Sequence, residues 1–168
     1  GSSVGAPTDV VSITRDTIKL EDQAAKQSVL NINNKGVTSK IGVITIPTFY
    51  LDFDARSRGV KNYRSTTRDV QELITELVKA EVEGILIDLR SNGGGSLSEA
   101  TALTGLFIDY GPVVQVKDSR GRISAEKDDK QGFIFKGPLG VLVDRHSASA
   151  SEIFAGAMQD YNRAVLIG

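Results

Sequence analysis

The chain has 168 residues, of which 40% are hydrophobic, with 20 basic and 21 acidic side chains. This size and composition suit one compact domain with a single core, and the nearly balanced charge argues against attraction to nucleic acid or an anionic membrane by the overall field. The absence of cysteine excludes disulfides and thiolate metal sites, and a single histidine, His146, excludes a multi-histidine metal cluster.

The N-terminal part of the chain predicts a short tail followed by strands. Residues 1–8 are expected to be a linker or a tag-like tail, since they have neither the basic nor the apolar region of a signal peptide. Alternating β-formers predict one or two short strands within residues 9–22. Two further strands are predicted over residues 26–33 and 41–49.

A long polar loop predicted over residues 51–67 leads to the helix that the sequence indicates most clearly. The apolar residues of this helix recur at the spacing of a single face: Val70, Leu73, Ile74, Leu77 and Val78. Its capping candidates are Ser65, Thr66 and Thr67.

Strands alternate with helices in the second half of the chain. Continuous apolar runs over residues 84–90 and 137–144 predict strands that are buried on both faces. Each run leads into a predicted helix, the first over about residues 97–108 and the second over residues 147–161. This alternation predicts an α/β fold with a largely parallel central sheet.

Weaker signals complete the predicted elements. A capping box between Ser96 and Glu99 begins the helix over residues 97–108. Residues 111–137 predict strands around a charged, exposed hairpin, and residues 163–168 predict a last strand.

The turns that follow the two buried runs should meet, because neighbouring parallel strands end at the same edge of a sheet. The first turn contains Gly93, Gly94 and Gly95, whose N–H groups beside a helix N-terminus suit a negative oxygen. The second turn presents serines at a helix start. A serine beside preorganised N–H groups is the minimum apparatus for acyl transfer. Taken alone, the three glycines also fit a simple tight turn.

The serines of the segment SASAS also have ordinary structural interpretations. Ser149 and Glu152 match a capping box, which places Ser147 before the helix and Ser151 inside it. Capping and nucleophilic attack are compatible roles for Ser149, since a helix N-terminus exposes the hydroxyl and stabilises negative charge. His146 is a candidate base, but no evident acid orients it, and packing or solvent exposure is the favoured interpretation.

Three other patterns are interpreted as structural. The glycine turn matches neither GxxxxGK[ST] nor GxGxxG, which disfavours nucleotide binding. Basic and aromatic residues within residues 53–64 lack an RNA-binding motif and indicate a solvated loop or a mobile lid. Asp88 and Arg90 are expected to form a structural ion pair, in which Arg90 could also hold the glycine turn.

Several long motifs resemble the C-terminal-processing, or tail-specific, serine peptidases, most closely their bacterial periplasmic branch. The motifs are TIKLEDQAAKQSV, GVITIPTFY, ILIDLRSNGGGSLSEATALTGLFI and GPLGVLVDRHSASASEIFAGAMQDYNRAVLIG. The resemblance implies a crotonase/ClpP-like core over residues 9–168, a Ser–Lys endopeptidase mechanism without metal or cofactor, and a periplasmic or cell-envelope location. It also implies protein or peptide substrates with apolar C-termini and an adaptor protein as partner.

The same resemblance implies roles for individual residues. Ser149 corresponds to the nucleophile, and the backbone N–H groups of Ala150 and of a glycine to the oxyanion hole, with Gly95 favoured over Gly94. The family also includes an aspartate that matches Asp160. Asp160 follows Ser149 by 11 residues, about 16 Å along a helix, so a cap or a bond to the following loop is favoured over a direct role.

The base of this family is a lysine in a TFGKG-like segment shortly after the last strand, whose pKa must be lowered by burial. The chain is expected to stop at Gly168 before that segment and to lack the family's PDZ-like module, so that it is inactive by itself. Two alternatives remain open. One is a non-catalytic peptide-binding or assembly fragment, a pseudoprotease. The other is a crotonase-type acyl-CoA enzyme, which needs no serine nucleophile.

Overall fold

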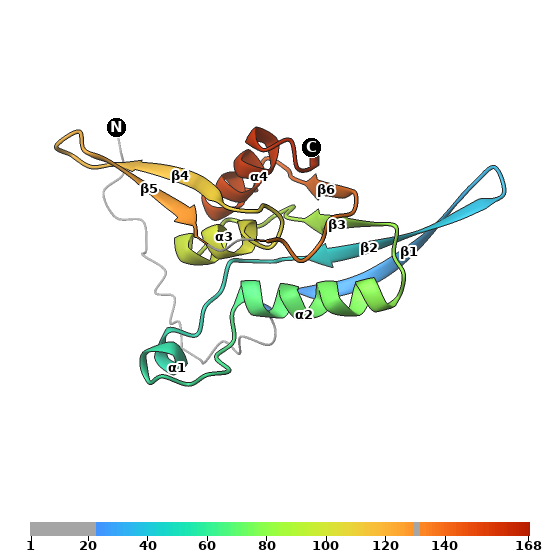
Figure 1. The fold of residues 1–168 in the computed structure, drawn as a ribbon, viewed down its shortest axis with the longest axis horizontal. Helices are drawn as coiled ribbons and strands as arrows, with labels where there is room; N and C mark the ends of the chain where they lie inside the picture. The colour runs from blue at the N-terminus through green and yellow to red at the C-terminus, as the bar shows by residue number, and fades with distance from the viewer. Residues whose placement is uncertain (1–22, 130–131) are drawn as a thin grey trace, which may run out of the picture.

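A computed structural model describes residues 23–129 and 132–168 (Figure 1). The strands predicted within residues 9–22 lie outside the described residues. The central sheet has five strands in the order β1-β2-β3-β6-β7. Their bounds are β1 Lys26–Asn34, β2 Val37–Thr45, β3 Gly84–Asp88, β6 Leu139–Leu142 and β7 Val165–Ile167. β1 pairs with β2 antiparallel and the other three pairs are parallel, which confirms the predicted α/β fold with a largely parallel sheet.

Four helices accompany the sheet: α1 Phe53–Ser57, α2 Thr66–Lys79, α3 Leu97–Thr104 and α4 Ala150–Asp160. α2 begins at its predicted cap, Ser65, whose hydroxyl accepts a hydrogen bond from the N–H of Arg68. α1 interrupts the stretch predicted as loop, because the Asp52 side chain accepts the N–H of Ala55 and starts a helical turn. Within the described residues, no helix has the length and apolar character needed to cross a membrane.

The capping box predicted at the start of α3 forms only in part. The Ser96 hydroxyl accepts the N–H of Glu99 at 3.3 Å, as expected for an N-cap. The Glu99 carboxylate does not bond back to Ser96, however, because it accepts the N–H of Thr67 at 2.8 Å. Glu99 is buried and therefore joins the N-terminal turns of α2 and α3. α3 ends at Thr104 rather than near Ile108, since the chain turns at residues 105–110.

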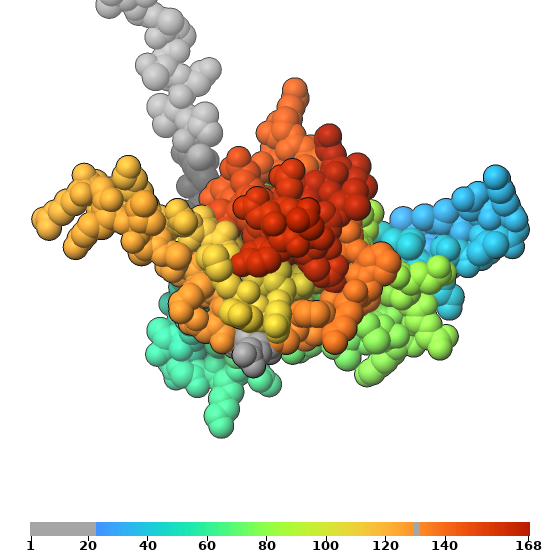
Figure 2. All heavy atoms as spheres, turned by 45° about the horizontal axis from the view of Figure 1, so that its top comes forward, coloured from blue at the N-terminus to red at the C-terminus, as the bar shows by residue number. Residues whose placement is uncertain are grey.

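A second sheet consists of the antiparallel hairpin β4 Gly111–Lys117 and β5 Ile123–Asp128. This is the charged hairpin that the sequence predicts over residues 111–137. Figure 2 shows this hairpin and the tip of the β1–β2 hairpin standing out from the body of the molecule. Both tips are consequently exposed on more than one side.

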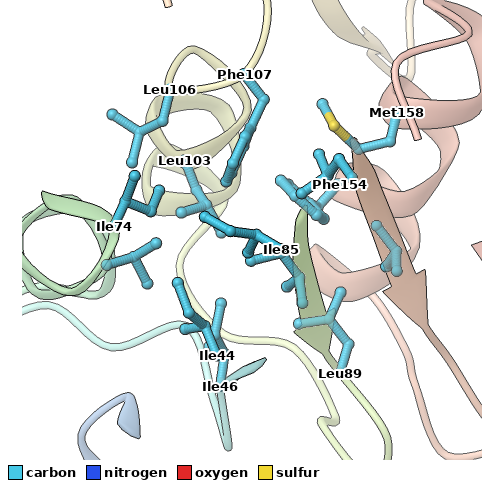
Figure 3. Close-up of a cluster of buried hydrophobic side chains, with 14 of the residues drawn as sticks. Ile44, Ile46, Ile74, Ile85, Leu89, Leu103, Leu106, Phe107, Phe154 and Met158 are labelled. Carbon is cyan, nitrogen blue, oxygen red and sulfur yellow. The ribbon is translucent and has the colours of Figure 1, made fainter. Parts of the chain in front are cut away.

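The hydrophobic core lies between one face of the central sheet and the helices α2, α3 and α4 (Figure 3). The sheet contributes a cross-strand row of inward side chains that includes Ile44, Ile87 and Val141, all with no exposed surface. The rings of Phe107 and Phe154 meet edge to face at 5.9 Å between their centroids. Packing on this face sets the position of the N-termini of α3 and α4.

The opposite face of the sheet is open in the described part of the chain. Cross-strand pairing places on it a row of apolar side chains that are half-buried or exposed: Leu30, Ile32, Ile41, Val43, Leu86, Leu142, Val165 and Ile167. The prediction that the strand after residue 83 is buried on both faces is therefore only partly correct, since Leu86 is half-buried.

Candidate active site

The two strand-to-helix turns meet, as predicted. They follow β3 and β6, which are neighbouring parallel strands. The N–H of Ala148 donates to the carbonyl of Asn92 at 3.0 Å, and a Cβ atom placed on Gly94 would lie 2.8 Å from the Cβ of Ser149. The turn with three glycines and the turn with three serines are thus in direct contact.

The three serines occupy three different environments. The hydroxyl of Ser147 donates to the carbonyl of Leu89 at 2.8 Å and so holds the serine turn to the end of β3. The hydroxyl of Ser151 is buried and donates to the carbonyl of Asn92 at 2.9 Å, which holds α4 to the glycine turn. Ser149 is exposed at the junction between them. Two of the three serines are therefore structural, and Ser149 alone presents its hydroxyl to solvent.

Ser149 has an unusual backbone for the residue before a helix. Its φ of 56° and ψ of −113° lie outside the extended region that N-caps normally adopt. The carboxylate half of the predicted capping box is well formed, since Glu152 accepts the N–H of Ser149 at 2.6 Å. The hydroxyl half is loose, because the Ser149 side chain lies toward α4 without a capping hydrogen bond of normal geometry. A strained residue with an unengaged hydroxyl is typical of a functional position.

The glycine turn is held by hydrogen bonds on both sides of Gly94. Its N–H donates to Oδ1 of Asn92 at 2.8 Å, and its carbonyl accepts the N–H of Phe49 and the hydroxyl of Thr48, both at 2.9 Å. Gly94 and Gly95 have φ values of 105° and 139°, which side-chain-bearing residues rarely adopt, whereas Gly93 has no positive φ. The three glycines are therefore not equivalent.

Two backbone N–H groups at this junction have no partner in the described part of the chain, those of Gly95 and Ala150. Gly95 is exposed, and Ala150 is the first residue of α4, so that its N–H belongs to the positive end of that helix. The N–H of Gly94, the other glycine considered for an oxyanion hole, is already bonded to Asn92. The arrangement offers one exposed hydroxyl and two available N–H groups.

Asn92 and Asp144 tie the two turns together, and neither was singled out from the sequence. Asn92 is fully buried, and its side-chain N–H donates to the carbonyl of Ile46 at 2.7 Å. The N–H of Ser91 donates to Asp144 and, with the N–H of His146 and the hydroxyl of Ser147, lowers the pKa of this carboxyl to about 2 although partial desolvation opposes the shift. An asparagine directly before three glycines is the signal that could have suggested a side-chain-stabilised turn.

The other predicted residues lie away from Ser149 or have structural partners. Asp160 is the last residue of α4, at the opposite end of that helix from Ser149. His146 is exposed, as expected, and its Nε2 accepts a hydrogen bond from Arg145. Asp88 and Arg90 form the expected ion pair at 2.7 Å, and the hydrogen bond from Arg90 lowers the pKa of Asp88.

No candidate base or metal cluster is present among the residues that the structure describes. Every lysine within residues 23–129 and 132–168 is exposed, including Lys117 and Lys136. Within the same ranges, no group of three His, Asp or Glu side chains is placed to hold a metal. A cavity of about 730 Å³ opens beside the first turns of α2, and its lining does not include Ser149 or the glycine turn.

Comparison with known proteins identifies the family. The model of peptidase family S41 matches residues 40–168. A tail-specific protease of Haemophilus influenzae is 44% identical over 98% of this chain, and the carboxyl-terminal-processing peptidase 2 of Arabidopsis thaliana chloroplasts is 32% identical over 98%. The chain spans only 21% and 29% of the lengths of these relatives.

A solved structure agrees with this assignment. The photosystem II D1 C-terminal processing protease superposes with a TM-score of 0.67 at 27% identity, over 84% of this chain and 35% of that one. These findings confirm the resemblance predicted from the motifs. This chain belongs to peptidase family S41.

Proposed function

We propose that this chain is the catalytic core of a tail-specific serine endopeptidase, with Ser149 as the nucleophile and the N–H groups of Ala150 and Gly95 as the oxyanion hole. The observation that carries the proposal is the junction itself. An exposed hydroxyl on a strained residue touches a glycine turn, and two N–H groups beside it have no partner in the described residues. Family membership supports peptide hydrolysis over the acyl-CoA alternative.

In the proposed reaction, the Oγ of Ser149 attacks a peptide carbonyl and loses its proton to a base. The carbonyl oxygen becomes negative and is stabilised by the N–H groups of Ala150 and Gly95. The C–N bond then breaks as the base returns the proton to the leaving amine. Water hydrolyses the acyl-enzyme through the same steps and restores the serine.

The base is proposed to be a lysine outside the described residues. An amine accepts the serine proton only when it is neutral, which requires burial or a nearby cation to lower its pKa. The exposed lysines of the described ranges do not meet this condition. We therefore expect residues 9–168 to be a core that hydrolyses nothing by itself, and a longer natural protein to be active.

The finer parts of the function follow from the same proposal. Substrates would be proteins chosen by apolar C-termini through a PDZ-like module, with help from an adaptor protein. The bacterial tail-specific relative supports a periplasmic or cell-envelope location. Asp160 is proposed to act at the C-terminal end of α4 and not in proton transfer, because it lies at the far end of the helix from Ser149.

Covalent labelling tests the proposal. The natural full-length protein would be treated with a fluorophosphonate probe, and the labelled peptide identified by mass spectrometry. We expect label on Ser149 and peptide hydrolysis, both abolished by Ser149→Ala and unaffected by Ser98→Ala, a matched change at another exposed serine. Label at another residue, or hydrolysis that survives Ser149→Ala, would reject Ser149. Peptide binding without label or cleavage would instead support the pseudoprotease alternative.

A further inference from the structure

The peptide group between Gly94 and Gly95 is held in place by the segment that follows β2. The carbonyl of Gly94 accepts two hydrogen bonds at 2.9 Å, one from the N–H of Phe49 and one from the hydroxyl of Thr48. The N–H of Ser96 donates to the carbonyl of Phe49 at 2.8 Å and completes an isolated parallel bridge around Gly95. Three hydrogen bonds therefore fix this short stretch of the glycine turn against residues 48–49.

The direction of the Gly95 N–H follows from the direction of the Gly94 carbonyl. In a trans peptide group the C=O and N–H bonds point in opposite directions. No cis peptide bond occurs in the described residues. Because the Gly94 oxygen points to Thr48 and Phe49, the N–H of Gly95 points away from them and has no partner among the described residues.

A glycine turn has little intrinsic resistance to rotation of this peptide group. Glycine accesses more backbone conformations than any other residue, and two glycines flank the group. The bond from Phe49 alone would leave the carbonyl free to rock about a single donor. The second donor, Thr48, is half-buried and β-branched, so that its side chain has restricted rotamers and holds its hydroxyl in one direction.

We propose that Thr48 is a positioning residue for the oxyanion hole, whose hydroxyl holds the Gly94 carbonyl and thereby aims the Gly95 N–H. This inference rests on the proposed function, since the N–H is useful only where a negative oxygen develops. Thr48 does not touch the reacting atoms in this account. Its effect is on the geometry of a donor that stabilises the transition state more than the bound substrate.

Substitution of Thr48 in the natural full-length protein tests this role. Thr48→Val keeps the branched shape and removes the donor, while Thr48→Ser keeps the donor and removes a methyl group. Thr75→Val is the matched control, because the Thr75 hydroxyl also donates to a backbone carbonyl at 2.9 Å, in α2. Steady-state hydrolysis would be measured together with the affinity for a peptide boronate, whose tetrahedral adduct on a serine mimics the transition state.

We expect Thr48→Val to lower kcat about tenfold, the scale of one neutral hydrogen bond, with little change in KM. The boronate affinity should fall in parallel, and Thr48→Ser and Thr75→Val should remain within about threefold of the original protein. The proposal is overturned if Thr48→Val keeps its kcat, if the loss is in KM, or if Thr75→Val loses as much. If valine disturbs folding, as judged by thermal unfolding, Thr48→Ala replaces it.

A second measurement separates this inference from the proposed function. The ¹³C resonance of the Gly94 carbonyl reports the hydrogen bond whether or not the protein cleaves peptides. We expect this resonance to move in Thr48→Val and to stay in Thr75→Val. An unchanged resonance rejects the role of Thr48 even in an active peptidase. Failure of the proposed function would appear differently, as absence of label on Ser149 in the unsubstituted protein.

Discussion

Gly94 shows how one residue without a side chain determines the geometry of this site. A Cβ atom on Gly94 would lie 2.8 Å from both the carbonyl oxygen of Ala148 and the Cβ of Ser149. Its positive φ adds backbone strain to any substitution. Gly93 is exposed, and a Cβ atom on it would meet nothing within 4 Å. Adjacent glycines in one motif thus have different requirements.

At this scale we predict that Gly94→Ala is far more damaging than Gly93→Ala. The free energy of unfolding should fall by about 2 kcal/mol or more for Gly94→Ala, because strained backbone and close contacts act together. For Gly93→Ala the change should be within about 0.5 kcal/mol. Urea unfolding of the two variants measures the difference. Equal stability would mean that the glycine turn does not pack against Ser149 in solution.

The elements that carry the site are joined through side chains rather than through a shared ladder. β3 and β6 bring the two turns to one edge of the sheet, but the turns themselves are irregular. Asp144 accepts the N–H of Ser91 at 3.0 Å and the N–H groups of His146 and Ser147 at 2.9 and 3.0 Å. Asp144 thus connects the start of the glycine turn to the start of the serine turn.

This junction between elements should depend on pH. The pKa of Asp144 is lowered to about 2 by the N–H of Ser91 and the other donors, below its value of about 3.9 in an unfolded chain. A lowered pKa in the folded state means that the stabilisation is complete above about pH 4 and disappears as the pH falls through about 2. We predict that Asp144→Asn is less stable than the unsubstituted protein at pH 7 and that this difference shrinks between pH 4 and pH 2.

Urea unfolding at a series of pH values measures this dependence. Ser91→Ala is the control, since it removes the side-chain bond of Ser91 but keeps the N–H that is the main cause of the lowered pKa. Ser91→Ala should therefore retain most of the pH dependence. A stability difference between Asp144→Asn and the unsubstituted protein that is constant down to pH 2 would contradict this role of Asp144.

On the scale of the whole molecule, the two faces of the central sheet differ in what covers them. α2, α3 and α4 all pack on one face, where Ile44 has no exposed surface. On the other face Leu30 and Ile32 are 48% and 50% exposed. The same two strands, β1 and β2, thus contribute to a packed core and to an open apolar surface.

We predict opposite outcomes for substitutions on these two faces. Replacing Leu30 and Ile32 together by threonine should lower the fluorescence of a bound apolar dye such as ANS and change the free energy of unfolding by less than about 1 kcal/mol. Ile44→Ala should leave a cavity and reduce stability by about 2–5 kcal/mol. Dye titration and urea unfolding test both statements. A large loss of stability in the threonine variant would show that the outer face is covered in solution.

The sequence by itself determined the alternation of strands and helices, the cap at Ser65, the strand-to-helix turns and the peptidase family. These features are readable because hydrophobic periodicity, capping residues and long motifs are local in the chain. The same locality explains the errors. Glu99 has the spacing of a capping box, but it binds Thr67, which is far away in the sequence and adjacent in space.

Only the tertiary structure decided which serine has an exposed hydroxyl and which glycine has an available N–H. Ser147, Ser149 and Ser151 are nearly identical in local sequence, and they differ because Leu89 and Asn92 accept hydrogen bonds from two of them. Gly94 and Gly95 likewise differ because Asn92 occupies the N–H of one. These partners lie dozens of residues from the serines or come from a neighbouring turn, and they meet only when parallel strands end at the same edge of the sheet.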